Sequence, residues 1–192
     1  MLILVSTVQK NLLPQKVRKT LYHSLFESHL NFGILLWGCA QNKHINKIEN
    51  LQKKCIRNVA LKHFRAHTEP IFKDLGILKF TDKLSYCRSV FMHQYRHEKL
   101  PPSFSGIFTE TTMSDARQSR HNDYNYRNEP AVRSTLEKFP LKQIIFNWNS
   151  LDIDLKAIGD LNDFQSMVNS KLLSQYNYET ECDIDCFSCS QK

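Results

Sequence analysis

Two pairs of aspartates stand at spacings that could present carboxylates to a metal ion, Asp152 with Asp154 and Asp183 with Asp185. In an extended strand alternate side chains share a face, so a metal pair at Asp152 and Asp154 is geometrically possible. Two-metal phosphoryl transfer needs carboxylates that hold ions about 3.5–4 Å apart. No two aspartates are adjacent in the chain, and no third acid accompanies Asp152 and Asp154. Turn and helix-cap roles are therefore favoured over a metal site.

Three cysteines near the C-terminus, Cys182, Cys186 and Cys189, offer thiolates at short spacing. A tetrahedral structural zinc site needs a fourth ligand. No histidine follows His121, so that residue or an upstream one would have to fold over, unless the ligand was lost from the C-terminus. Reduced tail cysteines are favoured over zinc, and adventitious disulfides are a third alternative.

The scattered cysteines Cys39, Cys55 and Cys87 predict reduced core residues rather than a secreted disulfide framework. A nucleophilic cysteine needs an electropositive, partly exposed setting, whereas the last two fall on apolar helical faces. His63 and His67 could share a helix face as metal ligands, but the zinc-protease motif is absent and loop histidines are favoured. We therefore expect no catalytic residue and no cofactor.

The clearest helical pattern begins at Asn42. At about 100° per residue its apolar side chains cluster on one side and its basic side chains cluster opposite. The basic face could lie along a phosphate backbone, with a merely solvated face as the alternative. The candidate contacts are Lys43, Lys47, Lys54 and Arg57, with Lys53, Arg65 and Arg127 as weaker candidates.

Charge is distributed unevenly along the chain. Residues 1–100 hold 17 Lys and Arg against 6 Asp and Glu, and residues 101–192 hold 9 against 13. The basic half suits RNA or DNA backbones, although anionic membranes and acidic proteins would also attract it. The apolar run 32–40 is far shorter than the ~20 residues of a membrane span, and the N-terminus lacks the basic region of a signal peptide. We expect an intracellular protein, nuclear or cytoplasmic, without a membrane partner.

Helices dominate the expected architecture, so the fold class is mostly α. Helical spacing predicts helices over 14–31 and from Asn42, and favours one at 34–37. Thr68 and Thr81 can cap two more, the first closed by Gly76. A loop is expected between 103 and 130, followed by a short segment over 141–148 that could be extended and a last helix around 164–173.

Several ordered blocks resemble one family, the jockey-type non-LTR retrotransposon reverse transcriptases, in the region that follows their polymerase core. They span roughly residues 1–176. The blocks are LLPQK at 12–16, LYHSLFESHLNFGI at 21–34 with WG at 37–38, LQKKCIR at 51–57, HTEPIFKDLGIL at 67–78, LPPSF at 100–104, YRN at 126–128, WNSL at 148–151 and the helix over 161–173.

This resemblance implies a helical, thumb-like region over 1–102, a linker over 103–137, a small α-rich region over 138–176 and an acidic, cysteine-containing tail over 177–192. It implies a truncated C-terminal region that binds template–primer or element RNA without polymerase chemistry, because the family's adjacent Asp pair is absent. The implied partners are an RNA or DNA backbone and the parent protein's upstream polymerase domain. The alternative is a helical protein–protein interaction module or a non-functional remnant.

Overall fold

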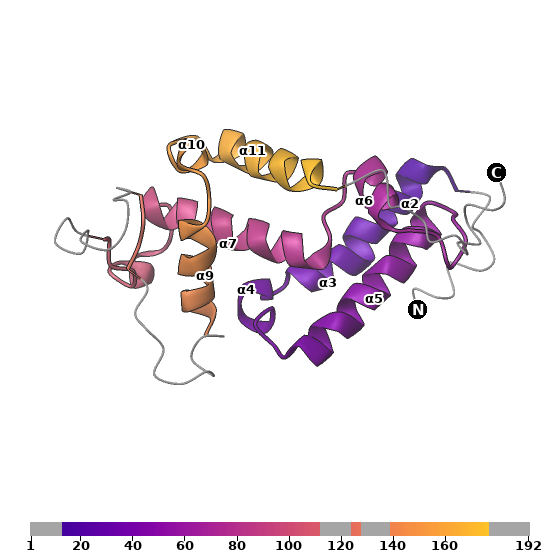
Figure 1. Cartoon of the computed structure of the whole chain (residues 1–192), viewed down its shortest axis with the longest axis horizontal. Helices are drawn as coiled ribbons and strands as arrows, with labels where there is room; N and C mark the ends of the chain where they lie inside the picture. Colours follow the sequence, from indigo (N-terminus) through magenta and orange to yellow (C-terminus); the bar gives the residue numbers. More distant parts are fainter. Residues whose placement is uncertain (1–12, 112–123, 128–138, 177–192) are drawn as a thin grey trace. The chain divides into compact units, whose positions relative to one another are not determined.

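The computed structural model describes residues 13–111, 124–127 and 139–176, and in these ranges the chain is mostly helical, as predicted. The only β pairing there is an isolated bridge between Glu110 and Tyr126. Figure 1 labels the α-helices. In order, they are α2 (Gln15–Tyr22), π-helix η1 (His23–Glu27), α3 (Ser28–Asn31), α4 (Ile34–Trp37), α5 (Asn42–Val59), α6 (Glu69–Leu75), α7 (Phe80–Arg96), 3-10 helix η2 (Pro102–Phe104), α9 (Pro140–Asn149), α10 (Ile153–Lys156) and α11 (Leu161–Ser174).

Contacts divide the chain into two compact units, each made from separate stretches of sequence. Unit 1 comprises Met1–Ile34, Gln41–Asp82 and Lys171–Lys192, and unit 2 comprises Leu35–Ala40 and Lys83–Ser170. The domain boundaries expected from the sequence remain predictions. Between them, the units contain every element that positions the candidate residues.

Unit 1 is built on the first helical segment and α5, and α2 packs against α5 (Figure 1). Tyr22, Phe26, Leu30 and Ile34 recur every fourth residue and are all buried. The π-helical turn η1 joins α2 to α3 within this run. A π turn holds more residues than an α turn, which keeps residues spaced by four closer to one face. The sequence predicted one helix here but not its widened turn.

Gln52 is the polar centre of unit 1 and is only 3% exposed. Its Nε2 donates to the Tyr22 hydroxyl at 2.9 Å and to the Leu78 carbonyl at 3.0 Å. Its Oε1 accepts the Phe80 backbone N–H at 2.8 Å. One buried amide therefore satisfies groups from the first helical segment, the 76–79 connection and the start of α7, as buried polar groups require.

The C-terminal ends of α5, α6 and α7 share one geometry, the Schellman motif. After α6, Gly76 has φ +62°, its N–H donates to the Lys73 carbonyl, and the Ile77 N–H donates to the Phe72 carbonyl. Leu61 and Glu98 occupy the corresponding positions after α5 and α7, with φ +54° and +52°. Side chains other than glycine pay a steric penalty in this region, so both positions are strained.

Unit 2 has an aromatic core formed by Trp148 of α9 and Phe164 of α11, both 0% exposed, with ring centroids 6.0 Å apart. Asn147 of α9 donates to the Ser85 carbonyl and the Ser89 hydroxyl of α7 at 3.1 and 2.9 Å. The prediction that 141–148 could be extended is wrong. Pro140 suits the first helical turn, and Ile144, Ile145 and Trp148 share the buried face of a helix.

The sequence also predicted one short helix and the residues at three helix ends. The helical assignment of 34–37 is confirmed, and Gly76 does end α6. Thr81 is not a cap, because α7 begins one residue earlier at Phe80. Thr68 occupies the N-cap position of α6 without a side-chain capping hydrogen bond.

Candidate nucleic-acid interface

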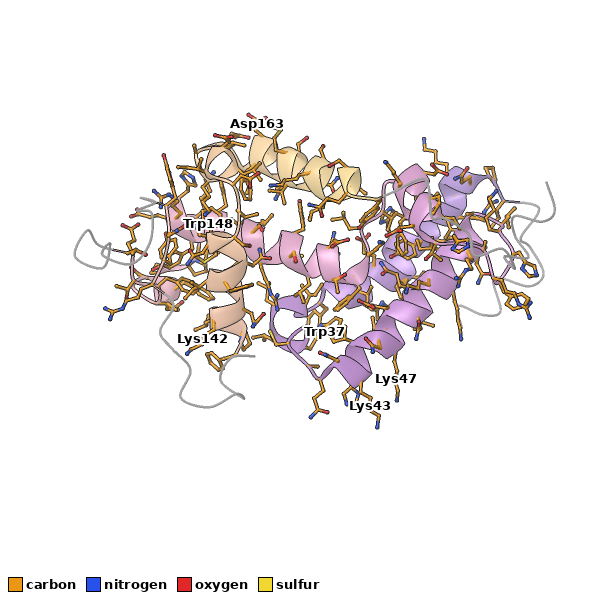
Figure 2. The ribbon with its side chains drawn as sticks, in the orientation of Figure 1. Trp37, Lys43, Lys47, Lys142, Trp148 and Asp163 are labelled. Carbon is orange, nitrogen blue, oxygen red and sulfur yellow. The ribbon has the colours of Figure 1, made fainter. Side chains whose placement is uncertain are left out.

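Three lysines form a stripe along the exposed side of α5, which we call the lysine stripe: Lys43, Lys47 and Lys54. All three are exposed, and at about 100° per residue they project within about 40° of one another. Figure 2 shows Lys43 and Lys47 pointing away from the helix into open space. The stripe forms because the opposite side of α5 buries Gln52, Ile56 and Val59.

The charge around the lysine stripe is one-sided. Glu49 is the single carboxylate of α5, and it lines a cavity away from the stripe. The described residues of unit 1 carry 13 Lys and Arg against 5 Asp and Glu. A surface of this kind raises the local concentration of anions and suits a ligand with repeated negative charges.

Lys53 and Arg57 lie on α5 outside the stripe and are both half-buried. Arg57 donates through Nε to the Ala66 carbonyl at 2.8 Å, which ties the end of α5 to the turn that follows it. Burial lowers the pKa of Arg57, although a guanidinium stays charged at neutral pH. Sequence periodicity placed this arginine on the basic face but did not indicate its structural hydrogen bond.

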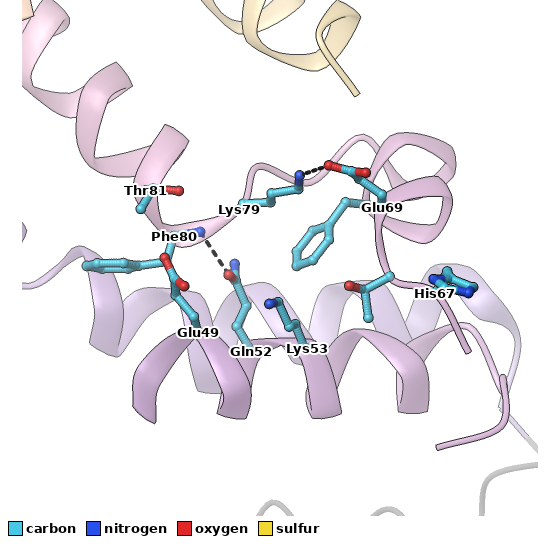
Figure 3. Close-up of a pocket in the computed structure, with 10 residues that line it drawn as sticks. Glu49, Gln52, Lys53, His67, Glu69, Lys79, Phe80 and Thr81 are labelled. Carbon is cyan, nitrogen blue, oxygen red and sulfur yellow. Dashed lines mark hydrogen bonds and ion pairs between the residues drawn. The ribbon is translucent and has the colours of Figure 1, made fainter. Parts of the chain in front are cut away.

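Lys53 lines a cavity of about 290 Å³ between α5, the N-terminal end of α6 and the start of α7. Figure 3 shows two interactions in the wall of this cavity, the ion pair between Lys79 and Glu69 and the hydrogen bond from the Phe80 backbone to Gln52. Acidic, basic and neutral groups mix in its walls, so the cavity has no single charge preference. The residues that line it are Glu49, Gln52, Lys53, His67, Thr68, Glu69, Phe72, Lys79, Phe80 and Thr81.

Arg65 lies in the turn between α5 and α6 and is exposed. Its guanidinium carbon lies 5.1 Å from the ring centroid of Phe64, a side chain that the sequence reading passed over. Phe64 is 69% exposed, which is unusual for so large an apolar group. The string LKHFR at 61–65 showed an aromatic residue among basic ones, but only the structure reveals its exposure.

Arg127 belongs to unit 2, whereas the other six candidates belong to unit 1. It is exposed, and its backbone N–H donates to the Thr109 carbonyl at 2.8 Å. The structure therefore gathers six candidates in unit 1 and leaves this one in the other unit.

The described residues that could bind a metal or act as nucleophiles lie in settings that do not favour these roles. Asp152 stands at the N-cap position of α10 and Asp154 in its first turn, both exposed. Cys39, Cys55 and Cys87 are not in disulfides, and burial raises the pKa of Cys55, which disfavours its nucleophilic thiolate. Cys182, Cys186 and Cys189 lie outside the described residues. Within 13–111, 124–127 and 139–176, no three His, Cys, Asp or Glu side chains gather as a metal site.

His63 and His67 are exposed in the connection between α5 and α6, as expected for loop histidines. In the part of the chain that the structure describes, no helix combines the length and apolar character that a membrane crossing requires.

No family profile and no solved structure matches this chain. Over 85 residues it is 29% identical to the "RNA-directed DNA polymerase from mobile element jockey" of Drosophila melanogaster, a match that covers 44% of this chain and 9% of that polymerase. The chain thus spans a small fraction of its relative, and it contains a region similar to a retrotransposon RNA-directed DNA polymerase.

Proposed function

We propose that this chain binds the phosphate backbone of RNA or DNA, with little sequence selectivity, through the lysine stripe of α5. The observation that carries the proposal is the alignment of three exposed lysines on one helix face with no carboxylate among them. Lys43 and Lys54 are eleven residues apart, or about 16 Å along the helix axis. That length matches several successive phosphates of one strand, which lie about 3.4 Å apart along a duplex axis.

The other candidates have supporting roles in this proposal. Arg65 extends the positive surface beyond the end of α5, and Arg57 and Lys53 add charge from half-buried positions. Contacts of this type position a polynucleotide and do not read its bases. Similarity to the jockey polymerase supports a nucleic-acid ligand, and we place this chain among the post-catalytic, thumb-like parts of such enzymes.

Binding without polymerisation is the activity we expect from the chain alone. The sequence has no adjacent Asp pair, and Asp152 and Asp154 stand at a helix start. Incubation of the full chain with primer, template, nucleotides and Mg²⁺ should yield no extension. Metal-dependent DNA synthesis by the purified chain would contradict this part of the proposal.

The salt dependence of binding tests the lysine stripe. The full chain should bind single-stranded and duplex RNA at about 50 mM salt and lose affinity steeply as salt rises, because each contacted phosphate adds about 0.7–0.9 to the slope. The double variant that carries both Lys47→Glu and Lys54→Glu should lower the slope of affinity against salt by roughly 1–2. No binding to either RNA at low salt would refute the proposal.

A matched control separates a defined surface from net charge. Lys16→Glu with Lys99→Glu makes the same change in net charge at two exposed lysines outside α5. This control should bind nearly as wild type does. If both double variants lose the same affinity, the chain binds through its overall charge and the lysine stripe has no special role.

A protein-docking function is the second candidate, favoured by a different observation. Phe32, at the end of α3, is 85% exposed, more than any other large apolar side chain in the described residues. Exposed aromatic groups are typical of surfaces that a partner covers. Sedimentation of the full chain alone, and of Phe32→Ser, tests whether this residue supports self-association.

A further inference from the structure

Phe64 is widely exposed and lies between two polar neighbours in the chain, His63 and Arg65. The side chain is 69% exposed, so most of its surface remains available to a ligand. The His63 ring lies 4.3 Å away, centroid to centroid, at 46°, and the Arg65 guanidinium carbon lies 5.1 Å from the Phe64 centroid. An aromatic ring left in water forgoes the hydrophobic stabilisation that burial would supply.

The turn that carries Phe64 is held by hydrogen bonds at both ends. Lys62 N–H donates to the Arg57 carbonyl at 2.9 Å, Ala66 N–H donates to the His63 carbonyl at 3.0 Å, and Arg57 Nε donates to the Ala66 carbonyl at 2.8 Å. Ala66 itself is buried. A ring on a short, tied turn loses little conformational freedom when it meets a ligand.

One of the two strained non-glycine residues among the described residues lies at the start of this turn. Leu61 takes φ +54° at a position where α6 uses Gly76. Strained positions persist only where surrounding structure enforces them, and they cluster at functional segments. The Schellman motif at Leu61 reverses the chain and starts the turn that presents Phe64.

The charge of this segment indicates which ligand would meet the ring. Between Glu49 and Glu69 the sequence contains no carboxylate and five Lys or Arg residues, which are Lys53, Lys54, Arg57, Lys62 and Arg65. A protein interface centre is depleted of charge, so a dense cationic surround favours a polyanion. A single polynucleotide strand offers both phosphates and unpaired aromatic bases.

We propose that Phe64 stacks against an unpaired base of single-stranded RNA or DNA while Lys62 and Arg65 contact the phosphates beside it. This inference rests on the proposed backbone binding and adds a preference for unpaired strands. Base–aromatic stacking tolerates any base, since every base has a π face. Bases inside a duplex are already stacked, so Phe64 would contribute little to duplex binding.

Binding of the full chain to three probes tests the inference. The probes are oligo-thymidine, an abasic deoxyribose strand of the same length, and a blunt duplex. Phe64→Ala should weaken oligo-thymidine binding roughly 5- to 100-fold and leave the other two affinities within about twofold. Phe64→Trp should retain tight oligo-thymidine binding, whereas Phe64→Leu should bind as Phe64→Ala does, because it is apolar but lacks a ring.

Phe146→Ala is the matched control, since Phe146 is also exposed, at 65%, and lies in unit 2. It should leave all three affinities unchanged. Equal weakening of the abasic strand and oligo-thymidine by Phe64→Ala, or no weakening of either, would overturn base stacking. If stacking fails while charge reversal on α5 still flattens the salt slope, backbone binding survives alone. If wild type binds no probe, both proposals fail.

Discussion

The side-chain amide of Asn149 pairs with both backbone groups of Tyr126. Its Oδ1 accepts the Tyr126 N–H at 3.1 Å, and its Nδ2 donates to the Tyr126 carbonyl at 2.8 Å. The amide thus does what a neighbouring β-strand residue would do. The flanking residues are held as well, because Trp148 Nε1 donates to the Tyr124 carbonyl at 2.7 Å and Lys156 Nζ donates to Asn125 Oδ1 at 3.0 Å. Segment 124–127 is therefore fixed to the α9–α10 corner.

Loss of the Asn149 amide should destabilise unit 2. Asn149→Ala leaves the N–H and carbonyl of Tyr126, a residue only 2% exposed, without these partners, and we expect a loss of about 1–3 kcal/mol in the free energy of unfolding. Urea unfolding, monitored by circular dichroism, measures this loss in the free energy of unfolding. Asn162→Ala, at an exposed position of α11, should change stability by less than about 0.5 kcal/mol. Equal stability of the two variants would contradict the role of Asn149.

Gln52 should be the most sensitive polar position of unit 1. Gln52→Leu keeps a similar volume but leaves the Phe80 N–H, the Leu78 carbonyl and the Tyr22 hydroxyl without their present partner. We expect a loss of at least about 2 kcal/mol, because each buried unsatisfied group costs about 1–3 kcal/mol. Asn50→Leu, on the exposed side of the same helix, is the control for adding an apolar side chain. Thermal and urea unfolding of both variants should separate them clearly.

The strained helix ends predict opposite effects from opposite substitutions. Glu98→Gly should stabilise the chain by up to about 1 kcal/mol, since glycine adopts φ +52° without the steric penalty. Gly76→Ala should destabilise it by about 1–2 kcal/mol. A Cβ at Gly76 would meet only Lys19 Nζ, at 4.0 Å, so this loss would come from backbone strain and not from a clash. Melting temperatures that move in the same direction would show that strain is not the cause.

His93 should make stability depend on pH. It is 0% exposed, its Nε2 hydrogen-bonds to the Ile158 carbonyl at 2.8 Å, and its Nδ1 has no partner among the described residues. Burial lowers the pKa of His93, despite the opposing hydrogen bond. The unfolded state therefore binds a proton first, and stability present above about pH 6.5 should be lost as pH falls below it, by at most about 1.4 kcal/mol per pH unit.

Replacing the ring isolates this contribution from the other histidines. His93→Gln can still donate to the Ile158 carbonyl but does not titrate, so the free energy of unfolding should fall less between pH 7.5 and 5.5 than in wild type. Urea unfolding at several pH values measures both slopes. Parallel curves would assign the pH dependence to other groups.

Sequence periodicity was most informative where a helix is amphipathic. It predicted α5 and its basic face because buried and exposed residues alternate there at a helical period over 18 residues. It failed for α9, a 10-residue helix whose short apolar run also fits a strand. In that segment Pro140 and the spacing of Ile144 and Trp148 favoured a helix. A short apolar run, however, rarely decides between a helix and a strand.

Contacts between distant residues were beyond the reach of sequence patterns. Nothing local indicates that Asn149 will pair with Tyr126, or that Arg57 will support the turn before α6. For the candidate site, residue type and period located the lysine stripe. They also ranked Lys54, which is exposed, above Lys53, which lines a cavity, but they could not show that Arg57 is half-buried and donates to the Ala66 carbonyl.

Tyr176, the last residue that the structure describes, belongs to unit 1, where its hydroxyl accepts the Lys79 N–H at 2.9 Å and donates to Asp82 at 2.5 Å. Lys73 Nζ donates to the Tyr176 carbonyl, 103 residues along the chain, at 2.8 Å. During synthesis the early helices must therefore wait until Tyr176 has left the ribosome before this unit can close. A shortened protein that stops before residue 176 would lack these three hydrogen bonds.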